Sequence, residues 1–339
     1  MSQLRNFGAC AWLLAIAYFA MAQAPPYRYI RAGESANLIV QSRPGFALMG
    51  GGTDLDEAFQ FLCDRANGGD MLVLRASGDD EYNPYLRGIC HLNSVSTLII
   101  PTRNAAADPF VSETVSHAAA IFIAGGDQAN YINFWMNTSL QAALNEAIKR
   151  GVPIGGTSAG LAVLGEYAYS AQGDKPDDPN LDGKTALADP FGPRVSLSHG
   201  FLDIPILKGT ITDTHFARRD RMGRLLVFLA RLNEPDGKPA PPNSPHFHGI
   251  GVDERAAVLL EPEGKAHVVG YGHAYFIDAD RGSGFLQKGK PLTYGPFVVQ
   301  KVAPGAEFYI KSWAGDAISY KLTVEAGKIH STQTANEIY

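Results

Sequence analysis

Residues 152–164 read VPIGGTSAGLAVL and join two short apolar stretches through a turn of small residues. The stretch at 152–154 has the character of a buried strand, and 161–164 that of a helix. The residues between them fit the pattern Gly-x-Ser-x-Gly around Ser158. Glycines on both sides remove the Cβ clashes of a sharp strand-to-helix turn. The segment therefore predicts an open α/β sheet with the Ser158 hydroxyl at its carboxyl edge.

The chain on either side continues this alternation. Short apolar runs at 45–50, 71–75, 97–101 and 120–124 are typical of strands buried on both faces. Helical periodicity fills 54–66 and 138–150. Strands that alternate with helices predict a mostly parallel sheet, flanked by helices and joined by right-handed crossovers.

The later part of the chain is less regular. Residues 171–195 are rich in Asp, Pro and Gly and predict a long surface excursion. Residues 250–272 and 320–332 have the pattern of β-hairpins. We therefore expect an α/β domain over 45–280 and a small C-terminal β extension over 283–339.

Composition excludes some functions. The 339 residues are 45% hydrophobic and carry a formal net charge of −5, which is an ordinary globular balance. Without a basic run, we expect no nucleic-acid partner. The apolar N-terminus ends in small residues with the A-x-A pattern, which predicts a signal peptide over 1–24, although an uncleaved anchor is the alternative. After removal of the signal peptide, we expect an exported protein, periplasmic or extracellular, outside the membrane.

Two cysteines remain beyond the predicted signal peptide. Cys63 and Cys90 lie in predicted helices that follow consecutive strands, and export permits a disulfide between them. Two buried free thiols are the alternative, and the sequence does not choose between them.

Ser158 has two interpretations. It is a nucleophile on an exposed turn, with the Ala159 N–H as an oxyanion donor, or it is an ordinary serine in a small-residue turn. The segment AGGDQ (124–128) forms a second glycine turn after a buried strand. Its Gly126 N–H would complete the oxyanion hole and Gln128 would contact substrate, unless Asp127 simply caps a helix.

A serine nucleophile needs a base, for which the sequence offers several histidines. His215 lies at a predicted loop-to-helix junction, which suits a base, but a surface histidine is an equal interpretation. His199 is a weaker candidate. His246 and His248 have metal-ligand spacing, but no third ligand accompanies them in the sequence, so we expect no metal and no cofactor.

Four segments together resemble one known family. FIAGGDQ (122–128), GGTSAG (155–160), DTHFARRDRMGRL (213–225) and GVDE (251–254), in this order, resemble the cyanophycinase and aspartyl dipeptidase family of serine peptidases. The resemblance implies an α/β fold related to class I glutamine amidotransferases, with the hairpins as additions. It also implies a possible homodimer.

The resemblance assigns roles to particular residues. Its nucleophile, base and acid fall on Ser158, His215 and Glu254, an order that differs from the Ser…acid…His order of α/β-hydrolases. Gly126 and Ala159 would form the oxyanion hole. The resemblance further implies substrate-binding positions, either lining or bracing a pocket, at Gln128, Asp213, Arg219 and Arg221.

The function that follows is hydrolysis of an amide bond in an aspartyl-containing substrate through an acyl-enzyme. The substrate would be a peptide or the Asp/Arg polymer cyanophycin. The alternatives are an exported aspartyl dipeptidase and a binding protein that keeps the fold without turnover.

Overall fold

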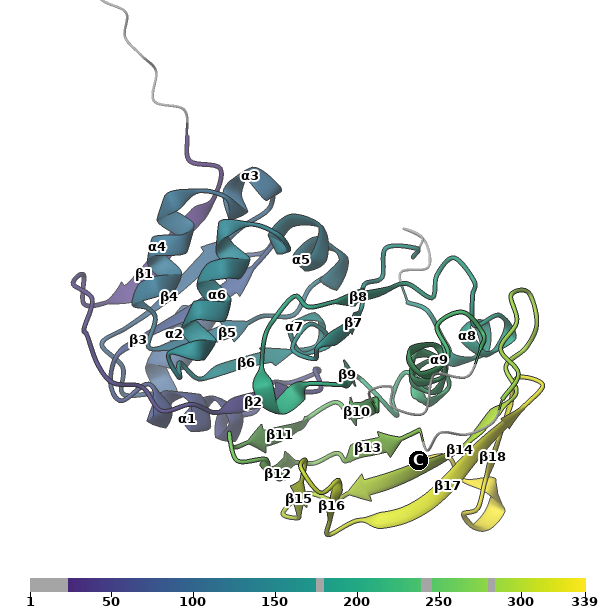
Figure 1. Cartoon of the computed structure of the whole chain (residues 1–339). Helices are drawn as coiled ribbons and strands as arrows, with labels where there is room; N and C mark the ends of the chain where they lie inside the picture. The colour runs from purple at the N-terminus through teal and green to yellow at the C-terminus, as the bar shows by residue number, and fades with distance from the viewer. Residues whose placement is uncertain (1–23, 175–179, 239–245, 280–283) are drawn as a thin grey trace, which may run out of the picture.

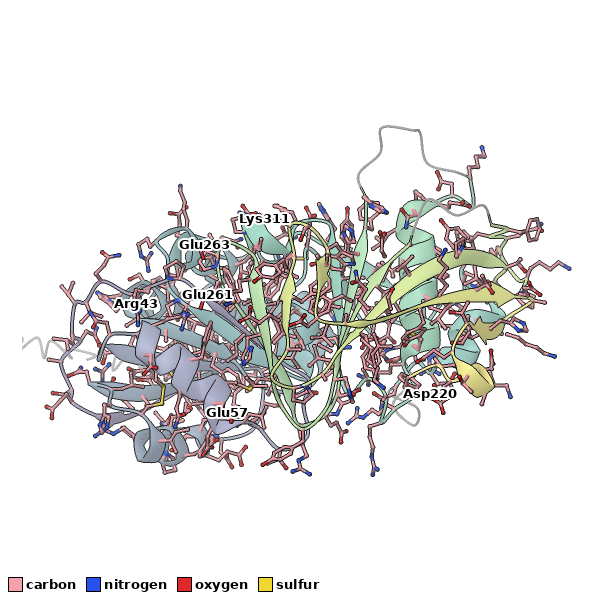
Figure 2. The ribbon with its side chains drawn as sticks, turned by 90° about the horizontal axis from the view of Figure 1, so that it is seen from below. Arg43, Glu57, Asp220, Glu261, Glu263 and Lys311 are labelled. Atoms are coloured by element: carbon pink, nitrogen blue, oxygen red, sulfur yellow. A yellow bond between two sulfur atoms is a disulfide. The ribbon has the colours of Figure 1, made fainter. Side chains whose placement is uncertain are left out.

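The computed structural model describes residues 24–174, 180–238, 246–279 and 284–339, and the predicted signal peptide over 1–24 lies almost wholly outside them. Within these residues the strands form two sheets that lie side by side (Figure 1). Figure 2 shows Glu57 in the half of the molecule formed by the first sheet and Asp220 in the half formed by the second.

The centre of the first sheet is parallel, as predicted. Its strands run in the order β4-β3-β5-β6-β2, and each pairs in parallel with its neighbours in this series. Their bounds are β2 Phe46–Met49, β3 Asp70–Arg75, β4 Ser94–Ile99, β5 Ala120–Ile123 and β6 Ile154–Thr157. The α/β class with a mostly parallel central sheet flanked by helices is confirmed.

Helices cover both faces of this parallel centre. Along β3, Leu72 and Leu74 face one hydrophobic cluster, and Met71 and Val73 face another, because successive strand residues point to opposite faces. The first cluster is covered by α3 Arg103–Ala106, α4 Pro109–His117, α5 Gln128–Trp135 and α6 Ser139–Lys149. The second is covered by α1 Asp56–Arg65 and α2 Tyr82–Ile89.

Antiparallel strands extend the first sheet at both edges. At one edge, β1 Arg28–Gly33 pairs with β4. At the other, the order continues from β2 through β11 Ala256–Leu260, β12 Lys265–Gly270, β15 Glu307–Tyr309 and β16 Ala314–Gly315. The hairpin predicted over 250–272 is thus β11–β12, while the residues before it belong to the second sheet.

The second sheet has the order β18-β17-β14-β13-β10-β9-β7-β8 and is parallel only from β7 to β10. The pattern of the sequence did not predict this separate sheet. Its strands are β7 Tyr167–Tyr169, β8 Leu197–His199, β9 Thr210–Asp213, β10 His248–Val252, β13 Ala274–Asp278, β14 Tyr294–Val302, β17 Ile318–Glu325 and β18 Lys328–Ser331. Helices α8 Gly183–Ala188 and α9 Met222–Asn233 pack on one face, and short 3-10 turns lie at Pro205–Leu207 and Thr334–Asn336.

The C-terminal strands are not separate from the rest of the fold. β14 and β17 continue the second sheet from β13, whereas β15 and β16 continue the first sheet from β12. Residues 284–339 therefore contribute strands to both sheets.

The two cysteines form a disulfide. Cys63 in α1 is bonded to Cys90, which caps the C-terminus of α2, so the bond ties the two helices that cover one face of the first sheet. No helix of the described residues is both long and apolar enough to span a bilayer.

Candidate active site

Ser158 occupies a strained turn between β6 and the short helix α7 Ala159–Ala162. Its backbone has φ 52° and ψ −118°, outside the regions that residues with a side chain ordinarily adopt. The flanking glycines, Gly156 and Gly160, permit the turn because backbone atoms of neighbouring segments lie where their side chains would be. A Cβ on Gly156 would stand 2.5 Å from the carbonyl carbon of Gly160, and one on Gly160 would stand 2.0 Å from the oxygen of Ile123. The small residues of the motif are therefore required by packing as well as by the turn.

His215 approaches Ser158 from the second sheet. It lies in the turn after β9, with φ 46°, and helix α9 begins only at Met222, so the expected start of a helix at His215 is wrong. The backbone N–H of His215 donates to the carbonyl of Gly50 (2.7 Å), which ties this turn to the end of β2. Its Nε2 lies 2.7 Å from Oγ of Ser158.

The two acids of GVDE do different things. Glu254 follows β10 and places Oε1 2.6 Å from Nδ1 of His215. Asp253 points elsewhere and accepts from the backbone N–H groups of Ala217 (2.8 Å) and His273 (3.0 Å). Asp253 therefore fixes the turn that carries His215, a positioning role that the sequence analysis missed.

The electrostatics suit a base and its partner. Burial lowers the pKa of His215, an effect that its hydrogen bond with Glu254 opposes and that Arg219 and Arg221 reinforce. The hydrogen bond from His215 holds the pKa of Glu254 below its usual value. At neutral pH the imidazole is neutral and the carboxylate is ionised. Because Nδ1–H donates to Glu254, Nε2 is left as the acceptor that faces Ser158.

The two predicted oxyanion donors frame the same turn. Gly126 follows β5 with φ 155°, and the Tyr131 hydroxyl holds its loop by donating to the carbonyls of Ala124 (2.8 Å) and Gly125 (3.1 Å). Ala159 is the first residue of α7. In the parts of the chain that the structure describes, neither the Gly126 nor the Ala159 N–H donates a hydrogen bond to the protein. Both remain available to a developing negative oxygen.

Residue Gln128 begins α5 two residues after Gly126 and is partly buried, while Asp127 caps the helix by accepting from the Ala129 N–H (2.9 Å). The structure thus shows the capping interpretation for Asp127.

The charged residues of the DTHFARRDR segment separate into buried and exposed groups. Asp213 is buried and forms a two-pronged ion pair with buried Arg224, with Arg221 3.6 Å away. Arg221 donates to the carbonyl and hydroxyl of Thr214. Their burial makes Asp213 and Arg221 braces beneath the site. Arg219 is different: its side chain is 42% exposed, and its Nε lies 4.0 Å from Oε1 of Glu254.

A hollow of about 480 Å³ lies beside this centre, lined by Thr53, Asp54, Asp56, Glu81, Tyr82 and Tyr85. Asp54 connects it to the turn, because it accepts from the hydroxyls of Thr157 (2.7 Å) and Tyr82 (2.6 Å). The lining is acidic and aromatic, which suits a cationic group. Of the acids in the loop segment SGDDEYNPY (77–85), Asp79, Asp80 and Glu81 are the ones that the sequence offers to a cationic group, and only Glu81 lines the hollow. The spacing of residues does not show which ones face a common hollow.

Comparison with known proteins agrees with the family that the four sequence motifs resemble. The cyanophycinase of Geminocystis herdmanii (strain PCC 6308) is 30% identical over 196 residues, covering 58% of this chain and 62% of the relative. The cyanophycinase of Thermosynechococcus vestitus (strain NIES-2133 / IAM M-273 / BP-1) is 28% identical over 242 residues, covering 68% of this chain and 66% of the relative. The model of peptidase family S51 matches residues 75–192. By these matches the chain is similar to peptidase family S51 over part of its length. The matches span somewhat less than two thirds of these relatives' own length.

A solved structure is similar in fold. The crystal structure of a peptidase from an acI-B1 Actinobacterium superposes with a TM-score of 0.50 at 17% identity, covering 79% of this chain and 98% of that one. This likeness supports the peptidase-like α/β architecture.

Proposed function

We propose that this protein is a member of peptidase family S51 and a serine peptidase that hydrolyses an amide bond next to an aspartyl residue, as a cyanophycinase does. The observation that carries the proposal is the continuous line of contacts from Ser158 Oγ to His215 Nε2 (2.7 Å) and from His215 Nδ1 to Glu254 Oε1 (2.6 Å). A nucleophile, a base and an orienting acid in this geometry are the parts of a hydrolytic triad.

The chemistry is acyl transfer in two halves. His215 Nε2 takes the proton of Ser158 as Oγ attacks the amide carbonyl carbon, and Glu254 stabilises the charged imidazole. The Gly126 and Ala159 N–H groups hold the carbonyl oxygen as it becomes negative. His215 then returns the proton to the leaving amine as the C–N bond breaks. Water, deprotonated by His215, attacks the ester and releases the acid, and Ser158 regains its proton.

Two features support an aspartyl substrate. Arg219 is an exposed cation close to Glu254 and can pair with a substrate carboxylate. The acidic hollow around Asp54 and Tyr82 can receive a cationic side chain, such as the arginine of an Asp/Arg polymer. Asn180, from the irregular excursion, accepts from Arg219 and Arg221, so this excursion reaches the edge of the site.

The test is hydrolysis of insoluble cyanophycin and, separately, of β-aspartyl and α-aspartyl dipeptides. We expect wild-type protein to release soluble fragments from the polymer, and Ser158→Ala and His215→Ala to release none above background. His199→Ala is the matched control, because His199 is exposed and pairs only at the surface with Glu166 (3.3 Å). Cleavage of dipeptides alone would support the dipeptidase alternative. Equal release by Ser158→Ala would overturn the nucleophile assignment, and no release from any substrate would favour a binding protein.

We also propose that the protein is exported. The Cys63–Cys90 disulfide supports this, because such bonds persist in oxidising compartments. Expression of the full chain with its N-terminus, followed by fractionation and N-terminal sequencing, tests it. We expect a mature chain outside the cytoplasm that begins after Ala22 or Ala24, and retention of Met1 in the cytoplasm would contradict export.

A further inference from the structure

Three metal-ligand side chains gather far from the candidate triad. His248 begins β10 and Asp278 ends β13, and these two residues are directly opposite each other in the antiparallel ladder. His246 lies just before β10. Its Nε2 stands 2.8 Å from Oδ1 of Asp278, while Nε2 of His248 stands 4.0 Å from the same oxygen. One ligand atom from each of the three residues lies within 4.8 Å of the others.

The sequence could not reveal this set. It showed the His-x-His pair, but the third ligand lies 30 positions beyond His248 and reaches it only through β10–β13 pairing. The expectation that no third ligand accompanies the histidines is therefore wrong. Opposite residues of an antiparallel pair project to the same face, which is why the imidazole and the carboxylate meet.

The spacing of the ligand atoms fits a small divalent ion. Zinc bonds of about 2.0–2.2 Å to nitrogen and oxygen place neighbouring tetrahedral ligands roughly 3.3–3.6 Å apart. The observed separations of 2.8 and 4.0 Å lie on either side of this range. Small side-chain rotations are therefore enough to surround an ion. The side chains are 36%, 21% and 27% exposed for His246, His248 and Asp278, so an ion can enter from solvent.

The surroundings hold the ligands in place. The ring of Trp313, from the segment before β16, lies against His248 with centroids 4.0 Å apart, and the Trp313 carbonyl accepts from the Gln300 side chain. Nε2 of His246 also lies 3.1 Å from the carbonyl oxygen of Ala279. Nε2–H of His246 can donate a hydrogen bond to these oxygens, and coordination of a metal through Nε2 requires that proton to move to Nδ1.

We propose that His246, His248 and Asp278 bind a divalent transition metal ion of the Zn²⁺ type, with water completing the coordination. The site is structural, because strand β10 holds His248 roughly 13 Å from the end of the strand that leads to Glu254. A bound ion would link β10 to β13 where Trp313, from the segment between β15 and β16, packs against His248 and Phe276 of the second sheet. The proposal does not depend on the peptidase activity.

The experiment uses the full chain, purified without a polyhistidine tag and stripped with a chelator. Co²⁺ is titrated while visible absorption is followed, and Zn²⁺ is then added in competition. We expect one equivalent of Co²⁺ to give bands of a low-coordinate site that Zn²⁺ abolishes, and Zn²⁺ to raise the melting temperature. His248→Gln and Asp278→Asn should each weaken binding by about tenfold or more, since even outer-shell partners contribute that much.

His199→Gln is the matched control, because His199 also pairs with a carboxylate, Glu166, but lacks a second histidine. We expect the His199→Gln variant to bind Co²⁺ and Zn²⁺ as tightly as the wild type does. If Asp278→Asn does not fold, His246→Gln carries the test, since this side chain is the most exposed of the three. Absence of saturable Co²⁺ or Zn²⁺ binding would overturn the proposal. So would binding that persists unchanged in His246→Gln and His248→Gln.

Discussion

Gly51 lies directly against the imidazole of His215: a Cβ built on Gly51 would stand 2.5 Å from Nε2, the atom that faces Ser158. The residue also has φ +95°, which side-chain-bearing residues rarely adopt. The loop after β2 therefore leaves room for the imidazole of His215 only because residue 51 has no side chain.

The first prediction is that Gly51→Ala disables the site. The methyl group must displace His215 from Ser158, and a shift of about 1 Å can lower a rate by about 10²-fold. The rate of labelling of Ser158 by a fluorophosphonate measures this without knowledge of the substrate. Gly68→Ala is the control, because Gly68 has a similar φ of +74° but open space around its Cβ position. Equal losses of labelling rate in Gly51→Ala and Gly68→Ala would mean that backbone strain, and not the contact with the His215 ring, causes the effect.

The second prediction concerns pH. Because burial lowers the pKa of His215, the neutral base persists below the usual histidine pKa of about 6.5. The rate should rise with pH along a limb whose midpoint lies below that value. In Glu254→Gln the contact that raises the His215 pKa is lost, so the limb moves to still lower pH while the plateau falls by about 10²–10⁴-fold. A pH profile of kcat/KM, or of labelling, checks both. A wild-type midpoint above the usual histidine value would contradict the burial argument.

The third prediction tests whether Arg219 binds the substrate. Arg219→Gln should raise KM for an aspartyl substrate by about tenfold, the effect of losing one charge-assisted hydrogen bond, while stability stays nearly unchanged. Arg218→Gln is the control, since it removes the same charge one position away on an exposed residue. A normal KM in Arg219→Gln would show that another group holds the substrate carboxylate.

The fourth prediction is that Asp213→Asn acts on stability. The substitution leaves buried Arg224 without its counter-charge, which typically costs about 3–5 kcal/mol. Urea denaturation followed by circular dichroism measures the loss. Asp220→Asn, at an exposed carboxylate of the same segment, is the comparison. A stable Asp213→Asn variant with a raised KM would instead place Asp213 in direct contact with substrate.

The fifth prediction concerns the disulfide between α1 and α2. Reduction opens a loop with a sequence separation of 27 between Cys63 and Cys90. The chain-entropy model assigns about 3–4 kcal/mol to a loop of this size. A reductant should therefore lower the denaturation midpoint of the wild type and leave that of the double variant Cys63→Ala/Cys90→Ala unaffected. An unchanged wild-type midpoint would show that the bond adds no stability.

The sequence by itself determined the local features of this protein. Buried strands and amphipathic helices have periods that are visible in the order of residues, so the parallel centre of the first sheet was predictable. The turn at Ser158 was also predictable, because its glycines are adjacent in the chain. The resemblance of four motifs then singled out His215 and Glu254, whose catalytic roles stay predictions.

Only the tertiary structure decided which side chains meet. Asp253 and Glu254 are neighbours in sequence, yet one holds backbone N–H groups and the other contacts His215. Asp213 and Arg219 share a segment, but one is buried with Arg224 and the other is exposed. Asp278 joins two distant histidines through strand pairing. The direction and burial of a side chain depend on contacts with residues far along the chain, and local pattern does not carry that information.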